Sequence, residues 1–184
     1  GEYPLSKAIM LVGEGSNGKS VYLELVRRLI GAENCTSVKL QDLAGDSRFS
    51  ASQLYGKMAN IYADLPSTLM RETGQFKILT GQDPISADRK YRDPITFVNY
   101  AKLLFSCNDL PRVEDTTTAF WRRWIVVEFP NRFPQNEEFK RTLFKELLPK
   151  VAPKLLAYAL LAVAHVVRGG KFSFEESEAD YRER

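Results

Sequence analysis

The chain has 184 residues, of which 44% are hydrophobic and 27% charged, a composition ordinary for one globular domain with a single core. Its net charge of +3 is too small to indicate nucleic-acid binding, so such an assignment depends on local clusters. Two cysteines, Cys35 and Cys107, and one histidine, His165, argue against a disulfide framework or a zinc site and fit a reducing cytoplasm. We expect a cytoplasmic protein in which His165 has a structural place only.

The chain begins its regular structure with a predicted strand and helix on either side of a glycine-rich loop. Residues 8–12 form a continuous apolar run, typical of a strand covered on both faces. Residues 21–31 carry apolar side chains at helical spacing. Between them, GEGSNGKS at residues 13–20 matches the phosphate-loop pattern G-x-x-x-x-G-K-[ST] in the strand–turn–helix context that this pattern requires.

Each residue type in this loop has a chemical reason. Glycines let the backbone turn its N–H groups onto phosphate oxygens, and the helix N-terminus adds attraction. Lys19 would neutralise the β- and γ-phosphates and the Ser20 hydroxyl would ligate Mg²⁺. The alternative is a structural glycine turn before a helix. The predicted ATP-binding residues are Gly13, Glu14, Gly15, Ser16, Asn17, Gly18, Lys19, Ser20 and Val21.

Further elements follow at intervals suited to an α/β domain. We predict a second strand in TSVKL (residues 36–40), a helix over residues 46–54, a third strand over 57–66 and a serine-capped helix over 67–81. The third strand ends on an acid and is stopped by Pro66.

The next segment predicts a hairpin and two more strands. Residues 82–100 contain two β-prone runs around the charged centre 88–93, which indicates a long hairpin with a basic tip. Residues 101–109 form a buried strand, and a short helix then leads into a strand over 124–129.

The remainder of the chain predicts helices. They span residues 137–148 and 154–167, with an interruption at Pro149 and Pro153. The apolar run 155–167 is shorter than the roughly twenty residues that a bilayer requires, so we expect a core helix and no membrane partner.

Two polar residues at strand ends are candidates to complete a nucleotide site. Asp64 closes the third predicted strand, where a carboxylate could hold the water shell of Mg²⁺ or orient the attacking water. Asn108 closes the strand over 101–109, where an amide could contact the γ-phosphate. The alternative is that both are ordinary turn residues.

With these residues in place, the chain resembles the superfamily 3 helicases of the AAA+ class, and especially the helicase domain of phage, plasmid and viral primase-helicases. The resemblance runs over residues 8–133 and rests on GEGSNGKS, the Asp64 strand, TGQDPISADRKYRDPITF, AKLLFSCNDLP and FWRRWIVVEFP. It implies an AAA+ type phosphate-loop core (residues 1–133) with a parallel sheet flanked by helices, a long β-hairpin insertion and a C-terminal helical segment (residues 134–184).

The resemblance also implies that ATP lies between two subunits of a ring, usually a hexamer. Lys19, Ser20, Asp64 and Asn108 would act from one subunit, with Ser20 and Asp64 at the metal, and Arg123 would act on the ATP of the neighbour. Arg122 is the fallback for that role. Many members have paired acids where Ala63 precedes Asp64 here, so the group that polarises water stays open, with Asp83 a distant candidate.

In the resembling family the hairpin grips single-stranded DNA in the central channel. Here its expected DNA-binding residues are Arg89, Lys90, Tyr91 and Arg92, whose cations can track phosphates while the tyrosine stacks on a base. The alternative is a solvated hairpin, because Asp88 and Asp93 offset part of the charge.

The predicted function is that of an ATP-dependent DNA helicase at a replication fork, the C-terminal part of a primase-helicase with a linked primase domain. Its host compartment would be the cytoplasm. Two other functions stay open: an AAA+ module for assembly or loading without unwinding, and a monomeric phosphate-loop kinase.

Overall fold

A five-stranded parallel sheet forms the middle layer of the molecule, with strand order β2-β3-β6-β1-β7. The computed structural model describes residues 5–45, 47, 49–134 and 137–169. The sheet strands are β1 (Ala8–Val12), β2 (Cys35–Thr36), β3 (Ala59–Leu65), β6 (Lys102–Cys107) and β7 (Trp124–Glu128). The inserted antiparallel hairpin pairs β4 (Pro84–Arg89) with β5 (Arg92–Val98).

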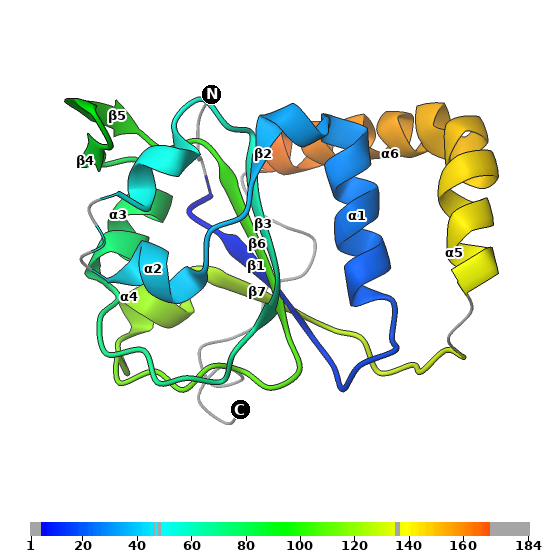
Figure 1. Ribbon diagram of the computed structural model, residues 1–184, viewed down its shortest axis with the longest axis horizontal. Coiled ribbons are helices and arrows are strands. Elements are labelled where there is room, and N and C mark those ends of the chain that lie inside the picture. Colours follow the sequence, from blue (N-terminus) through cyan, green and yellow to red (C-terminus); the bar gives the residue numbers. More distant parts are fainter. Residues whose placement is uncertain (1–4, 46, 48, 135–136, 170–184) are drawn as a thin grey trace.

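Helices cover both faces of this sheet (Figure 1). Helices α1 (Lys19–Ile30), α5 (Glu137–Thr142) and α6 (Leu148–Gly169) lie on one side. Helices α2 (Leu40–Ala44), α3 (Gly74–Gly81) and α4 (Thr118–Trp121) lie on the other. Single turns of 3-10 helix span Ala32–Asn34 and Ala51–Leu54, and a π-helical turn spans Leu143–Leu147. The expected α/β core with a parallel sheet and a hairpin insertion is confirmed.

Alternation along β1 divides the core between the two faces. Ala8 and Met10 belong to the larger cluster under α2, α3 and α4, whereas Leu11 packs with Leu23 of α1 and Leu104. Because the parallel sheet is covered on both sides, β1 is apolar at every position, as the run over Ala8–Val12 predicts.

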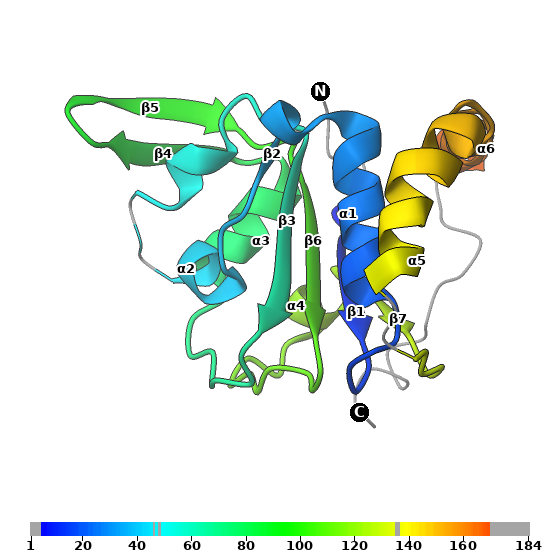
Figure 2. The same ribbon diagram turned by 45° about the vertical axis from the view of Figure 1, so that its right-hand side comes forward.

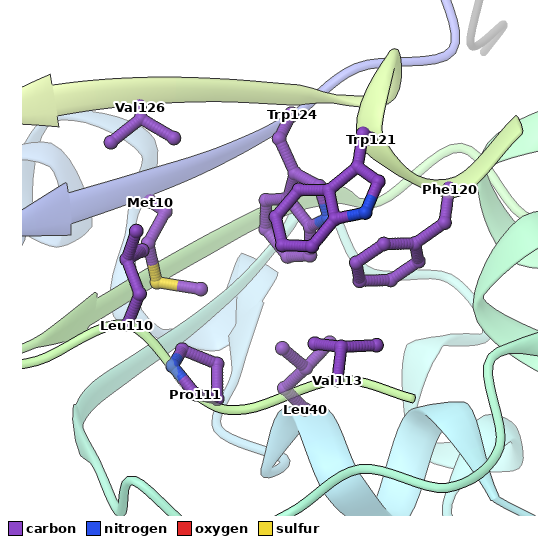
Figure 3. Close-up of a pocket in the computed structure, with 9 residues that line it drawn as sticks. All are labelled: Met10, Leu40, Leu110, Pro111, Val113, Phe120, Trp121, Trp124 and Val126. Atoms are coloured by element: carbon purple, nitrogen blue, oxygen red, sulfur yellow. The ribbon is translucent and has the colours of Figure 1, made fainter. Parts of the chain in front are cut away.

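Aromatic rings dominate the larger cluster. Phe76 stacks on Trp124 with ring centroids 4.7 Å apart, and Phe120 lies 5.8 Å from Trp124. A small cavity beside these rings is lined by apolar side chains (Figure 3), namely Met10, Leu40, Leu110, Pro111, Val113, Phe120, Trp121, Trp124 and Val126. This cavity is part of the core packing.

The second predicted strand and the helix after it differ from expectation. Strand β2 has only two residues, because the Asn60 side chain pairs with both backbone groups of Val38, at 2.7 Å and 3.0 Å, and ends the ladder. Helix α2 then begins at Leu40. Of the helix expected over residues 46–54, only a 3-10 turn over Ala51–Leu54 is present, and residues 46 and 48 lie outside the described residues.

The helix expected from Ser67 begins instead at Gly74. The segment before it is extended, because Met70 N donates to Arg112 O at 2.7 Å and Glu114 N donates to Met70 O at 3.0 Å. The serine-cap prediction for this helix was therefore wrong: tertiary pairing with the loop after β6 outweighs local helix propensity.

The C-terminal helices differ in two ways from their prediction. Helix α6 continues through Pro149 and Pro153 where an interruption was expected. Pro149 directly follows the π-helical turn Leu143–Leu147, where the α-helical hydrogen-bond pattern is already interrupted, and Pro153 removes one bond from a helix of 22 residues.

The expectation of a core helix over residues 155–167 was also wrong. Large apolar side chains on α6 are exposed, and only 6% of an 18-residue apolar window within Leu143–Gly169 is buried. This stretch is long and apolar enough to cross a membrane, by length and composition alone. A contact to α1 is made where the Arg28 guanidinium lies 4.6 Å from the centre of the Phe144 ring. The exposed set on α6 is Val151, Leu156, Tyr158, Leu160, Leu161, Val163 and Val167.

Candidate nucleotide-binding site

The phosphate-loop motif occupies the turn between β1 and α1, as the sequence predicts. Helix α1 begins at Lys19, two residues earlier than expected, and Gly18 precedes it with φ 88°. Gly15 has φ 86°, and nothing lies within 4 Å of where its Cβ would be. These left-handed conformations favour glycine, and a loop backbone bent in this way can turn its N–H groups toward an anion.

A segment after β7, residues 129–133, braces this loop; we call it the strap. Asn17 Nδ2 donates to Phe129 O at 3.1 Å, and Phe133 N donates to Ser16 O at 2.7 Å. A Cβ on Gly13 would lie 2.5 Å from Phe129 O, so only glycine allows this approach. The loop motif itself carries no signal for the strap, which sequence reasoning missed.

The Lys19 ammonium is buried among oxygen atoms. The residue is 6% exposed, and its Nζ donates to Gly13 O, to Asn17 Oδ1 at 3.1 Å and to Asn108 Oδ1 at 3.4 Å. A triphosphate would offer this cation stronger, charged acceptors in the same place. The arrangement therefore fits phosphate binding and joins the predicted residues Lys19 and Asn108.

Asp64 lies at the same carboxyl edge of the sheet. It is exposed, has φ 59°, and occupies a register break in the β3–β6 pairing, where its N donates to Ser106 Oγ at 3.3 Å. Asp64 and Lys19 both act on the buried thiol of Cys107: burial raises the pKa of that thiol to about 11, Lys19 lowers it, and Asp109 and Asp64 raise it.

The residues present fit a magnesium ion held jointly by protein and substrate. Ser20 is exposed at the start of α1, as a metal ligand must be. Among the described residues there is no cluster of three or more His, Cys, Asp or Glu that could hold a metal alone. Mg²⁺ typically takes one or two protein oxygens and completes its shell with substrate phosphates and water, so Ser20 and Asp64 would suffice.

Arg123 lies at the opposite, amino edge of the sheet. Its carbonyl accepts from Ala8 N at 2.7 Å, its Nε donates to Thr80 Oγ1 at 3.0 Å, and its Nη1 donates to Ala119 O. Burial and the neighbouring Arg122 lower the pKa of Arg123, and Asp83 partly offsets them. Strand β1, five residues long and so about 16 Å, separates this arginine from the phosphate loop of its own chain.

The two fallback residues are also at this amino edge. Arg122 is exposed, beside the half-buried Arg123. Asp83 Oδ2 and Arg123 Nη2 lie 2.9 Å and 3.8 Å from the position of a Cβ on Gly81. Within one chain, Asp83 therefore does not join the residues around Lys19.

The hairpin projects away from the helical layers (Figure 2). Its base is held by the buried side chains of Ile85 and Ala87. Tyr91, with φ 59°, is fully exposed at the turn, and Lys90 and Arg92 beside it are exposed too. The fourth predicted residue, Arg89, is half-buried, and its Nε donates to Asp93 O at 3.0 Å.

A carboxylate network that the sequence did not reveal fixes α3 against the loop after β6. Asp115, whose side chain is 11% exposed, lies 2.5 Å from Lys77 Nζ and accepts from Thr73 Oγ1 and from Thr117 N and Oγ1. Burial alone raises the pKa of Asp115, but hydrogen bonds from Lys77, Thr117 and Thr73 outweigh it and hold the pKa well below its usual range.

The sheet order, the loop on β1 and the inserted hairpin together define a phosphate-loop α/β domain. The chain belongs to the DUF5906 family, whose model matches residues 11–123 and is described as a family of unknown function. The apo C-terminal region of NrS-1 has a similar fold, with TM-score 0.60 and 20% identity over 81% of this chain and 34% of that one.

Two viral proteins are similar in sequence. The Acanthamoeba polyphaga mimivirus protein named "Putative helicase L207/L206" is 34% identical over 146 residues, which is 77% of this chain and 15% of that protein. "Putative helicase 121R" of Invertebrate iridescent virus 3 is 27% identical over 146 residues, 73% of this chain and 15% of that protein. The chain thus spans about 15% of the length of these relatives.

Proposed function

We propose that this chain is the ATP-hydrolysing motor domain of a DNA helicase that translocates on single-stranded DNA as a ring. The ring would be a hexamer, in the replication of a phage, plasmid or other mobile element, with the chain as the C-terminal part of a primase-helicase. The observation that carries the proposal is the division of the predicted residues between two edges of one sheet. Lys19 and Asn108 meet at the carboxyl edge, and Arg123 lies at the amino edge.

This division fits a site completed by a second copy of the chain. Head-to-tail packing around a ring sets one edge of each subunit against the opposite edge of the next. Arg123 cannot reach the loop of its own chain past the length of β1. In a ring, its guanidinium would leave Thr80 and Ala119 and neutralise charge on the γ-phosphoryl group of the neighbouring subunit's ATP.

The remaining residues take complementary parts in the proposed reaction. Lys19 would exchange its loop oxygens for β- and γ-phosphate oxygens, and Asn108, already beside Lys19, would orient the γ-phosphate and the attacking water. Mg²⁺, held by Ser20 and Asp64, would neutralise charge on the phosphates when bound.

The hairpin supplies the proposed DNA contact. Its exposed Lys90 and Arg92 can follow phosphates without regard to sequence, and the fully exposed Tyr91 can stack on a base. Repeating this tip around a ring would concentrate positive charge in the channel, although the chain as a whole has a net charge of only +3. The names of the two viral relatives support the same function.

The testing experiment measures ATP hydrolysis by the complete protein with and without single-stranded DNA. We expect DNA to stimulate hydrolysis and Lys19→Ala to abolish it. Arg123→Ala should also be inactive alone, but mixing it with Lys19→Ala should restore part of the activity, because some interfaces then combine an intact loop with an intact arginine. Absence of such complementation would contradict a shared site.

A strand-separation assay on a forked duplex distinguishes the helicase from an AAA+ module for assembly or loading. DNA-stimulated hydrolysis with no strand separation would assign the chain to the second class. The basic, exposed hairpin tip favours the helicase.

A further inference from the structure

The strap places an aromatic ring at the rim of the phosphate loop. We propose that Phe133, together with Tyr22, forms the platform on which the base of the bound nucleoside triphosphate stacks. This inference rests on the proposed function, because it concerns the same nucleotide.

Phe133 is held in place yet left open to solvent. Its backbone N donates to Ser16 O at 2.7 Å, and its Cε2 atom is 3.9 Å from where a Cβ on Gly18 would lie. The residue nevertheless remains 58% exposed. A ring fixed by its backbone beside a phosphate loop, with much of its surface uncovered, is suited to receive a flat ligand.

Tyr22 supplies the second ring from the first turn of α1. Its backbone N donates to Gly18 O at 2.9 Å, so the backbone of Tyr22 is fixed next to the glycine that the Phe133 ring approaches. Tyr22 is 42% exposed and meets Phe129 edge to face, with centroids 6.1 Å apart. Phe129 is itself fixed to the loop through its carbonyl and Asn17.

The place of these rings agrees with the covalent structure of the ligand. One sugar joins the base to the α-phosphate, so a base bound with its phosphates on Lys19 must lie just outside the loop. Gly18, with φ 88°, leaves that rim free of a side chain. The strap and the first turn of α1 border this rim together.

The strap is secured in a way that permits adjustment to a ligand. Two of its attachments are the hydrogen bonds of Phe129 and Phe133 to the loop. Another is the backbone hydrogen bond from Phe129 N to Val12 O at 2.8 Å. The ion pair between Arg132 and Glu14, whose side chains are 67% and 77% exposed, adds little, as is usual for exposed pairs. The Phe133 ring can therefore settle against a base without breaking a buried interaction.

Stacking predicts a specific pattern of base preference. Every base has a π-face, so a platform accepts all of them and favours those with more ring area. We expect purine nucleotides to bind more tightly than pyrimidine nucleotides, with little difference between ATP and GTP.

The test compares two ligands that share phosphates and differ in the base. Binding of ATP and of inorganic triphosphate is measured by calorimetry for the wild type, Phe133→Ala, Phe133→Trp and Lys19→Ala. We expect Phe133→Ala to weaken ATP about tenfold, within the range of stacking losses, and to leave inorganic triphosphate unchanged. Phe133→Trp should restore ATP binding. Phe49→Ala, at a residue 50% exposed and outside the loop and strap, is the matched control.

Each other result has a distinct meaning. Equal weakening of both ligands by Phe133→Ala would overturn the platform and make Phe133 a brace for the loop. Unchanged ATP affinity would overturn it as well. If Lys19→Ala bound both ligands as tightly as the wild type, the phosphate site on which the proposed function depends would be refuted. That outcome is independent of the result for Phe133→Ala.

Discussion

The Oδ1 atom of Asn108 lies 3.4 Å from the Nζ atom of Lys19, although the two residues are 89 positions apart in the chain. The parallel pairing of β1 with β6 produces this contact, because it aligns Val12 with Cys107 and brings the residues after both strands to one edge. The order of the strands in the sheet thus determines which residues lie beside the phosphate loop.

The first prediction concerns this amide. Asn108→Ala removes a group placed for the γ-phosphate but leaves the loop and its cation, so we expect kcat to fall about 10²-fold while ATP still binds. Steady-state hydrolysis and nucleotide titration in parallel measure the two effects. An unchanged kcat would show that Asn108 only supports the apo position of Lys19.

The second prediction concerns the hairpin tip. Lys90→Ala should spare hydrolysis without DNA and weaken single-stranded DNA binding and unwinding, because the side chain is exposed and far from the loop. A plot of log affinity against log salt should become shallower by about 0.7 for each DNA phosphate that the variant no longer neutralises.

Lys150→Ala removes an exposed cation from α6 and serves as the matched control. Its salt dependence should equal that of the wild type. Equal losses of DNA affinity in the two variants would mean that binding depends on the total charge of the protein and not on the hairpin tip. Normal unwinding by the Lys90 variant would refute the assignment of the hairpin to the channel.

The third prediction separates the two adjacent arginines. Arg123→Ala should lower kcat by about 10³-fold or more if its guanidinium acts across the subunit interface, whereas Arg122→Ala should retain most activity. Because Arg123 also donates to Thr80 and Ala119, its removal should cost about 1–3 kcal/mol of unfolding free energy. Denaturant unfolding measures that cost. A reversed order of the two reductions in kcat would assign the interface role to the exposed Arg122.

The fourth prediction concerns acid stability. Because the folded state holds the pKa of Asp115 low, this carboxylate stabilises the protein above about pH 4, where an unfolded aspartate is ionised. That stabilisation is lost as the pH falls further and the unfolded state takes up its proton. We expect Asp115→Asn to lower the unfolding free energy by about 1–3 kcal/mol at pH 7 and by less at pH 3.

Denaturant midpoints at the two pH values test this expectation. The exposed Asp109 provides the control, since Asp109→Asn should change neither midpoint by a comparable amount. If Asp115→Asn lost the same amount of stability at both pH values, the loss would come from changed hydrogen bonding and packing of the side chain and not from its charge.

Features with strong local signals could be predicted from the sequence. The phosphate loop combines a fixed motif with a flanking strand and helix, and the hairpin alternates around a charged turn, so both were located correctly. The sequence also predicted where β3 and β6 end, and their parallel pairing brings Asp64 and Asn108 to the same edge of the sheet.

Features that depend on tertiary partners could not be read in this way. Nothing local shows that Asn60 ends β2, or that Met70 pairs beside Val113 and delays α3. The strap could not be predicted either, because Phe129 and Phe133 contact a loop that lies 112 or more positions earlier in the chain. Helix α6 has a core-like sequence and an exposed surface, a combination that periodicity cannot reveal.

The thiol of Cys107 gives this protein a built-in chemical reporter. Burial keeps it fully covered and raises its pKa to about 11, so at neutral pH it is neither accessible nor ionised, and alkylating reagents require the thiolate. Labelling of Cys107 by a maleimide therefore requires β1, β3 and β6 to separate at their shared edge. Its rate would measure how often the centre of the sheet opens, and how far a bound nucleotide keeps it closed.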